Sequence, residues 1–132
     1  MRRNARIKLW NHIITVSSEK IIERYKQIKQ GESYKDVQER IKGEKIKVEY
    51  SNVYRRFKAN EPSTTIANPR KSMYIHYKQN RGLSVREAAR LQSFPDNFIF
   101  RSSKSFQQQQ VANAVPPLLA KAIARKIIEN PI

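Results

Sequence analysis

The sequence has no cysteine among its 132 residues and only three glycines. Without a thiol, this chain can form no disulfide, no thiolate metal site and no cysteine nucleophile. The glycines, Gly31, Gly43 and Gly82, lie too far apart to form a loop in which the backbone approaches a ligand closely. No apolar run approaches the roughly 20 residues that cross a bilayer, and no cluster of His, Asp and Glu has metal-ligand spacing. We therefore expect a cytoplasmic protein with no membrane partner and no metal.

Acidic residues are also few, and this imbalance points to a partner. The chain has 11 Asp and Glu against 27 Lys and Arg, which gives a formal net charge of +16. The excess is spread along the chain, with 16 basic and 7 acidic residues in 1–60 and 11 and 4 in 61–132. A polyanion is the natural partner, because each neutralised phosphate releases condensed counterions. The alternative is a basic surface that only meets solvent.

The N-terminal half mixes two helix patterns with strand patterns. Ser17 or Ser18 can cap a first helix, whose apolar residues recur at helical spacing and which stops at Gly31. Ser33 begins a second helix that we expect to run to about Ile41. Alternating or β-branched and aromatic residues predict short strands over residues 45–50, 53–57 and 64–66.

The C-terminal half has clearer helix signals. Ser84 with Glu87 forms a capping-box pattern, and the helix that it begins should stop before Pro95. The last helix should begin at Pro116–Pro117, where missing amides cost least, and end at Asn130. One face of it is apolar: Leu118, Leu119, Ala122, Ile123 and Ile127. The mixture predicts an α+β fold, with a boundary between residues 1–69 and residues 70–132.

Four stretches carry a resemblance to a known family. Residues 81–96 (RGLSVREAARLQSFPD) resemble the ninth motif of the DNA (cytosine-5)-methyltransferases, and residues 110–117 (QVANAVPP) resemble the tenth. Upstream, Tyr54–Phe57 and Pro62–Ile66 look like the end of the family's target-recognition region. Two motifs in order at the right separation are far more specific than either alone.

The resemblance implies the C-terminal part of such an enzyme, as in members made of two chains or in a truncated fragment. Residues 1–69 would be a basic, DNA-binding target-recognition region of short strands and helices. Residues 70–132 would be a helical segment that packs on a Rossmann-like catalytic domain supplied elsewhere. Restriction-modification systems of prokaryotes are the expected setting, in the cytoplasm or nucleoid.

The resemblance also says which chemistry this chain lacks. In the family, a cysteine thiolate attacks C6 of a cytosine that has left the base stack, and C5 takes a methyl group from S-adenosylmethionine. This chain has no cysteine and no glycine-rich cofactor loop. We therefore expect no catalytic residue here, no activity of the chain alone, and S-adenosylmethionine shared with a partner subunit that carries the family's Pro-Cys motif.

Site residues follow by matching positions to the family's motifs. Asn113 and Ala114 would line the S-adenosylmethionine pocket, with Asn113 as a plain helix cap the alternative. Double-stranded DNA would contact a set of basic and hydroxyl side chains: Arg55, Arg56, Lys58, Thr64, Thr65, Arg70 and Lys71. The alternative is a solvated face for the basic residues and an ordinary strand for the threonines. A supporting, structural role falls to five residues of the ninth motif: Arg81, Arg86, Glu87, Gln92 and Pro95.

Two other functions remain open from the sequence. The two N-terminal helices have helix-turn-helix dimensions, which would suit an autonomous DNA-binding or regulatory protein. Asp36 and Glu39 on the second helix argue against a groove-reading face. The chain could also be the remnant of a disrupted methyltransferase gene, in which case the apolar face of the last helix would stay uncovered.

Overall fold

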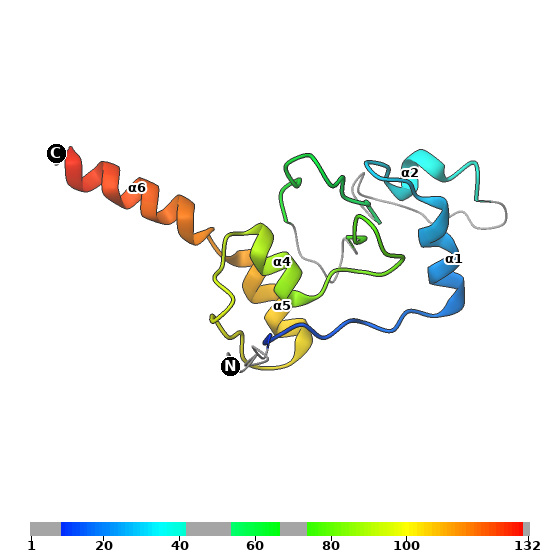
Figure 1. The fold of residues 1–132 in the computed structure, drawn as a ribbon, viewed down its shortest axis with the longest axis horizontal. Coiled ribbons are helices and arrows are strands. Elements are labelled where there is room, and N and C mark those ends of the chain that lie inside the picture. The colour runs from blue at the N-terminus through cyan, green and yellow to red at the C-terminus, as the bar shows by residue number, and fades with distance from the viewer. Residues whose placement is uncertain (1–8, 42–53, 67–73, 131–132) are drawn as a thin grey trace, which may run out of the picture.

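The structure is a computed structural model, and it describes residues 9–41, 54–66 and 74–130. These residues form five helices: α1 (Glu19–Gln27), α2 (Tyr34–Val37), α4 (Val85–Leu91), α5 (Lys104–Asn113) and α6 (Pro117–Glu129). Figure 1 shows α1 and α2 together at one end, α4 packed on α5 in the middle, and α6 reaching away at the other end.

Helix α1 forms where the sequence predicts it. Ser18 is the N-cap residue in extended conformation, and Glu19 in the first turn complements the positive end of the helix dipole. Tyr25 and Ile28 are buried on its inner side. The chain then turns at Gly31, whose φ of +86° lies in the left-handed region, and a Cβ there would stand 2.4 Å from Lys58 Cε.

Helix α2 begins at the predicted place but is shorter than expected. Ser33 and Asp36 form a capping box, in which Asp36 Oδ2 accepts from the Ser33 amide at 2.7 Å. The helix ends at Val37, and the next residues form a turn in which the Arg40 and Ile41 amides donate to the Val37 carbonyl. Tyr34 and Val37 are buried, so the helix is anchored by its inner face.

The predicted strands do not form in the described residues. Extended pairing there consists of two isolated bridges, Arg56 with Ile75 in parallel and Ile75 with Gly82 in antiparallel orientation. Residues 64–66 have no ladder partner, and Tyr74 Oη instead donates to the Thr65 carbonyl. The candidate over residues 45–50 lies outside the described residues. The described part of the chain is therefore helix-rich, and the α+β class is not confirmed.

The C-terminal helices include one that the sequence patterns did not reveal. Helix α4 begins as predicted, with Ser84 Oγ accepting from the Glu87 amide at 3.1 Å and Glu87 Oε2 accepting from the Ser84 amide at 2.8 Å. Helix α5 was not predicted, because its glutamine-rich sequence has no apolar stripe, and Val111 is its one buried residue. Helix α6 begins at Pro117, with Pro116 as N-cap, and ends at Glu129.

Two clusters of buried side chains hold the described residues together. One joins α4 and α5 to the segments before them, through Ile66, Tyr74, Val85, Ala88, Ala89, Phe100 and Val111. The other joins α1, α2 and the central loop through Tyr25, Ile28, Tyr34, Val37 and Ile75. Burial of each large apolar side chain contributes about 1.5–3 kcal/mol. No residue of α6 is buried in either cluster.

The segment before α1 runs from α1 back to the α4–α5 pair (Figure 1). Near its start the Asn11 amide donates to the Phe100 carbonyl at 2.8 Å, and further along Lys104 donates to Thr15 Oγ1. Contacts therefore cross the expected boundary between residues 1–69 and residues 70–132. That two-part division stays a prediction.

Candidate functional site

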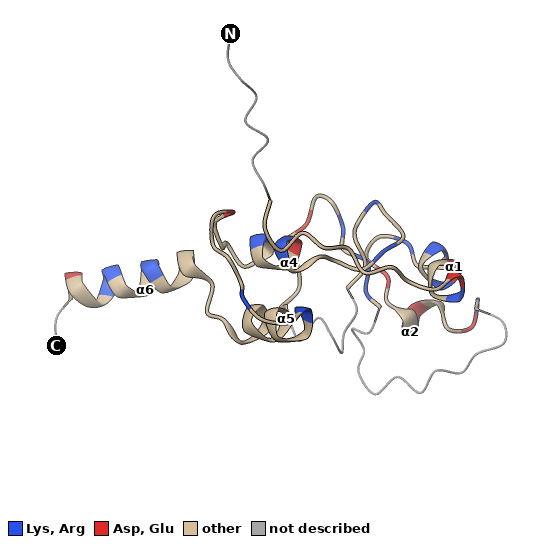
Figure 2. Cartoon of the chain, turned by 90° about the horizontal axis from the view of Figure 1, so that it is seen from below, with Lys and Arg blue, Asp and Glu red and all other residues tan. Residues whose placement is uncertain are grey.

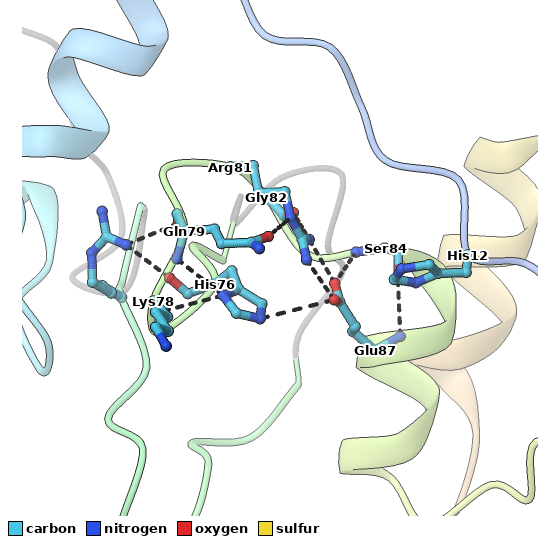
Figure 3. Close-up of polar contacts among 9 residues, drawn as sticks. His12, His76, Lys78, Gln79, Arg81, Gly82, Ser84 and Glu87 are labelled. Carbon is cyan, nitrogen blue, oxygen red and sulfur yellow. Dashed lines mark hydrogen bonds and ion pairs between the residues drawn. The ribbon is translucent and has the colours of Figure 1, made fainter.

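A polar network at the start of α4 organises the loop before it (Figure 3). Arg81 makes a two-pronged ion pair with Glu87, at 2.8 Å and 2.7 Å. The carboxylate also caps the helix through the Ser84 amide, and Ser84 Oγ lies 2.9 Å from Nδ1 of His12 in the N-terminal segment. His76 completes the network, with Nε2 3.9 Å from Glu87 Oε1.

The charges in this network are fixed near neutral pH. Burial alone would raise the pKa of Glu87, but hydrogen bonds from Arg81 and the Ser84 amide outweigh it and lower the pKa to about 2. Burial, with the charge of Arg81, lowers the pKa of His76. Because His76 Nδ1 accepts from the Lys78 and Gln79 amides, its proton lies on Nε2, which faces Glu87. The network is a structural ion pair with a neutral histidine beside it.

Arg86 is fully buried and joins α4 to the N-terminal segment. Its guanidinium donates to the carbonyls of Trp10 and Pro95, each at 3.0 Å, and to the carbonyl of Phe98. The guanidinium also lies 5.9 Å from the centre of the Phe100 ring. Its donors face carbonyls of the chain itself, and its supporting role stays a prediction.

Arg56 corrects one DNA-binding prediction. Its side chain is 5% exposed, and Nε and both terminal nitrogens make five hydrogen bonds within the chain. Two of the acceptors, the Tyr25 and Ile28 carbonyls, stand at the C-terminus of α1, where the Tyr25 carbonyl also accepts from the Ile28 amide at 3.2 Å. The others lie in the loop of residues 76–80. Since a guanidinium has five donors, none is left for a phosphate.

The neighbours of Arg56 surround a small hollow of about 60 Å³ beside Gly31. Arg55, Lys58 and Thr64 line it, and Thr64 Oγ1 is buried there without a hydrogen-bond partner among the described residues. Lys58 Nζ is paired with Glu61 at 2.6 Å, but both side chains are about half exposed, so this pair contributes little. Arg55 and Lys58 bring two cations to the hollow, and Glu61, the partner of Lys58, lines it as well.

The remaining DNA-binding candidates are not gathered at this hollow. Thr65 is exposed next to it in sequence, whereas Arg70 and Lys71 lie outside the described residues. Within the described residues, the other Lys and Arg positions are distributed over α1, α4, α6 and the loops between the helices (Figure 2). The positive charge therefore gives a general attraction for a polyanion, and the hollow offers the more specific contact.

Asn113 and Ala114 lie in the turn between α5 and α6. Asn113 ends α5 instead of capping α6, and its exposed Oδ1 accepts from Gln109 Nε2 at 3.0 Å. Its amide nitrogen can still donate. Ala114 is extended, with φ −78° and ψ 145°. Asn113 therefore offers one side-chain donor beside the small side chain of Ala114, whereas the first turn of α6 offers few amides, because Pro116 and Pro117 have none and the Leu118 amide donates to Ser93 Oγ.

Asn11, which no sequence pattern singled out, is central to this arrangement. Asn11, at φ 62°, donates to the Phe100 carbonyl and to Gln107 Oε1 and accepts from the Phe100 amide at 3.0 Å. An asparagine is a natural occupant of a left-handed position. Nothing in the local pattern signals its partners, because they lie nearly 90 residues away.

Two searches of the described residues were negative. No group of three or more His, Asp and Glu side chains could hold a metal ion there. None of the described helices is long and apolar enough to span a membrane.

The fold resembles part of a DNA methyltransferase. A solved structure of a putative DNA modification methyltransferase encoded within a prophage, from E. coli, matches with a TM-score of 0.69 at 28% identity. The match covers 90% of this chain and 28% of that one.

The model of the C-5 cytosine-specific DNA methylase family matches residues 3–129, so the chain belongs to that family. It is 40% identical to the type II methyltransferase M1.HphI of Haemophilus parahaemolyticus over 90% of this chain, but spans 31% of that relative. It is 33% identical to the type II methyltransferase M.AquIB of Picosynechococcus sp. over 97% of this chain, and there it spans 92% of the relative.

Proposed function

We propose that the chain is the C-terminal subunit or fragment of an S-adenosylmethionine-dependent DNA (cytosine-5)-methyltransferase. It supplies DNA recognition and one wall of the cofactor pocket, and a second polypeptide supplies the cysteine nucleophile. S-adenosylmethionine, when bound, supplies the methyl group. The residues of this chain orient and bind: Asn113 and Ala114 face the cofactor, and Arg55, Lys58 and Thr64 face a DNA phosphate.

The observation that carries the proposal is the uncovered face of α6. Five large apolar side chains are more than half exposed on this helix: Leu118, Leu119, Ile123, Ile127 and Ile128. A soluble monomer rarely leaves so many together, so the face fits a partner surface. The methyltransferases with longer chains provide the natural candidate, because this chain spans 31% of M1.HphI. The high coverage of M.AquIB supports a family member of about this length.

The first experiment adds the missing part. The chain is mixed with a polypeptide that carries the family's glycine-rich and Pro-Cys motifs, and methyl transfer to DNA is followed with labelled cofactor. We expect transfer from the mixture and none from either chain alone. Transfer of a methyl group by the 132-residue chain on its own would contradict the proposal, and so would a mixture that neither associates nor reacts.

The second experiment tests the α6 face. Ile123→Ser removes one apolar side chain from it, whereas Lys121→Ser makes the same replacement at a charged, exposed position. Burial of an isoleucine contributes about 1.5–3 kcal/mol, so association should weaken roughly 10- to 100-fold for Ile123→Ser only. Equal effects of the two variants would show that the face is not the interface.

The third experiment tests the phosphate contact through salt dependence. Arg55→Ala should flatten the slope of log affinity against log salt by about one phosphate, and Lys58→Ala by a similar amount. A variant that keeps the wild-type slope would show that the replaced residue does not contact a DNA phosphate.

The structure offers less to an autonomous DNA-binding protein. Helix α2 has four residues, and Tyr34 and Val37 of these are buried. A helix this short presents too little surface to read a major groove. A non-functional fragment of a disrupted gene can be told from a subunit by two measurements. The fragment would bind an apolar dye at α6 and would not associate with the catalytic chain.

A further inference from the structure

Two adjacent residues at the end of α4 hold both ends of the turn between α5 and α6. Gln92 Nε2 donates to the carbonyl of Val111, in the last turn of α5, at 2.7 Å. Ser93 Oγ accepts from the amide of Leu118, in the first turn of α6, at 3.2 Å. The segment between these two points contains Asn113 and Ala114.

Few other contacts hold this turn. Helix α6 buries no residue, so packing does not fix where it begins. The Ala114 amide also donates to the Val111 carbonyl, but at 3.4 Å, which is a long hydrogen bond. Gln92 itself is 7% exposed and belongs to the firm end of α4, where its own amide donates to the Ala88 and Ala89 carbonyls. Rigidity therefore passes from α4 to the turn through these two side chains.

We propose that Gln92 and Ser93 are positioning residues, which hold the α5–α6 turn in the conformation that receives S-adenosylmethionine. The proposal rests on the proposed function. Binding is tightest when the site is already ordered, since a mobile turn must lose conformational entropy as the ligand binds. The two side chains touch the turn and not the cofactor, so their effect is on affinity for the cofactor and not on the chemical step.

A feature of Gln92 separates this role from a merely structural one. Its Oε1 is buried and has no hydrogen-bond partner among the described residues. An unpaired buried carbonyl is itself destabilising. Gln92→Met removes the hydrogen bond to Val111 and this unpaired oxygen together, and it keeps the side-chain volume. Loss of the hydrogen bond destabilises the fold and loss of the unpaired oxygen stabilises it, so the net change in stability is small. The turn loses its hydrogen bond in either case.

The test uses the assembled complex with the catalytic chain, and S-adenosylmethionine as the titrated ligand. For Gln92→Met we expect an unchanged melting temperature and unchanged affinity for DNA, with the Kd for the cofactor raised about tenfold, as for loss of one buried hydrogen bond. Ser93→Ala, whose bond is exposed, should raise the Kd about threefold. Hydrogen exchange of the amides in residues 112–118 should quicken in both variants.

A charge variant adds a readout in pH. In Gln92→Glu, a carboxylate oxygen faces the Val111 carbonyl, and only the protonated acid can donate to it. Burial raises the pKa of such a glutamate. Cofactor affinity of this variant should therefore recover as pH falls, while the wild type and the matched surface variant Gln110→Glu show no such recovery. Gln110 is exposed on α5 and undergoes the same change of charge.

The outcomes distinguish the two proposals. If the wild-type complex does not bind S-adenosylmethionine, the proposed function fails. If the wild type binds and Gln92→Met binds equally well, the positioning role is wrong. A variant that melts earlier but binds the cofactor as the wild type does, with no pH-dependent recovery in Gln92→Glu, would reduce Gln92 to a packing residue.

Discussion

Arg56 gives the sharpest test of how this chain is held together. Arg56→Met keeps much of the aliphatic side chain and removes the guanidinium, leaving five acceptors without their donor. The acceptors belong to two separate parts of the chain, the C-terminus of α1 and the loop of residues 76–80. Loss of these five hydrogen bonds should therefore loosen the N-terminal helices from the rest of the molecule.

The magnitude follows from the balance of two costs. Hydrogen bonds from a charged donor contribute about 1.5–3 kcal/mol each, but burial of the guanidinium has a desolvation cost, which also lowers the pKa of Arg56. Removal of one partner from a buried ionic arrangement typically costs about 3–5 kcal/mol. A domain of this size is stable by about 5–15 kcal/mol, so the variant should lose a large share. Arg56→Lys has three donors in place of five and should lose about 2–4 kcal/mol.

The assay is urea unfolding followed by far-ultraviolet circular dichroism, with the free energy of unfolding taken by linear extrapolation. Arg55→Met is the matched control, because Arg55 is the adjacent arginine and is only half-buried. Its effect on stability should stay within about 0.5 kcal/mol. A loss below about 1 kcal/mol for Arg56→Met, or equal losses for the two variants, would refute the assignment of Arg56 as the link between the two parts.

Two further predictions concern the turn at Gly31 and the carboxylate of α4. Gly31→Ala should destabilise the chain by about 1–2 kcal/mol, because φ is +86°, in the left-handed region that a residue with a Cβ rarely adopts; the exposed end of Lys58, which the Cβ would meet, can move aside. Gly82→Ala, with 3.8 Å to the nearest atom, should change the melting temperature little, and the same shift for both would contradict this. The pKa of Glu87 is lowered to about 2, so its ion pair with Arg81 stabilises the fold above the unfolded-state pKa of about 4.3 and this stability is lost as pH falls toward 2. The stability difference between the wild type and Glu87→Gln, followed by thermal melts, should shrink over that range, and a difference independent of pH would exclude this.

Local signals predicted the helix starts well. Ser18, Ser33 and Ser84 each stand at the N-cap of a helix, and Ser84 with Glu87 forms the capping box that the sequence indicates. These predictions succeed because a cap involves residues three apart in the chain. Pro117 at the start of α6 is of the same kind.

The errors fall where distant contacts decide. Helix α5 has no apolar stripe and is held through Val111 against α4. Residues 64–66 have strand composition but no partner strand among the described residues, and Tyr74 Oη donates to the Thr65 carbonyl. Arg55 and Arg56 are adjacent and identical in type, yet one lies at a hollow and the other is buried with all five donors used. Composition cannot separate two such residues.

The sequence by itself determined the family, through two ordered motifs. It also determined the chemistry that the chain lacks, because folding cannot supply a cysteine that the sequence does not contain. The tertiary structure decided which basic residues are free and that Gln92 and Ser93 reach across to the turn after α5. It did so because hydrogen bonds and burial depend on which backbone carbonyls come within about 3 Å of a side chain, and the partners here lie about 20 to 90 residues apart in the chain.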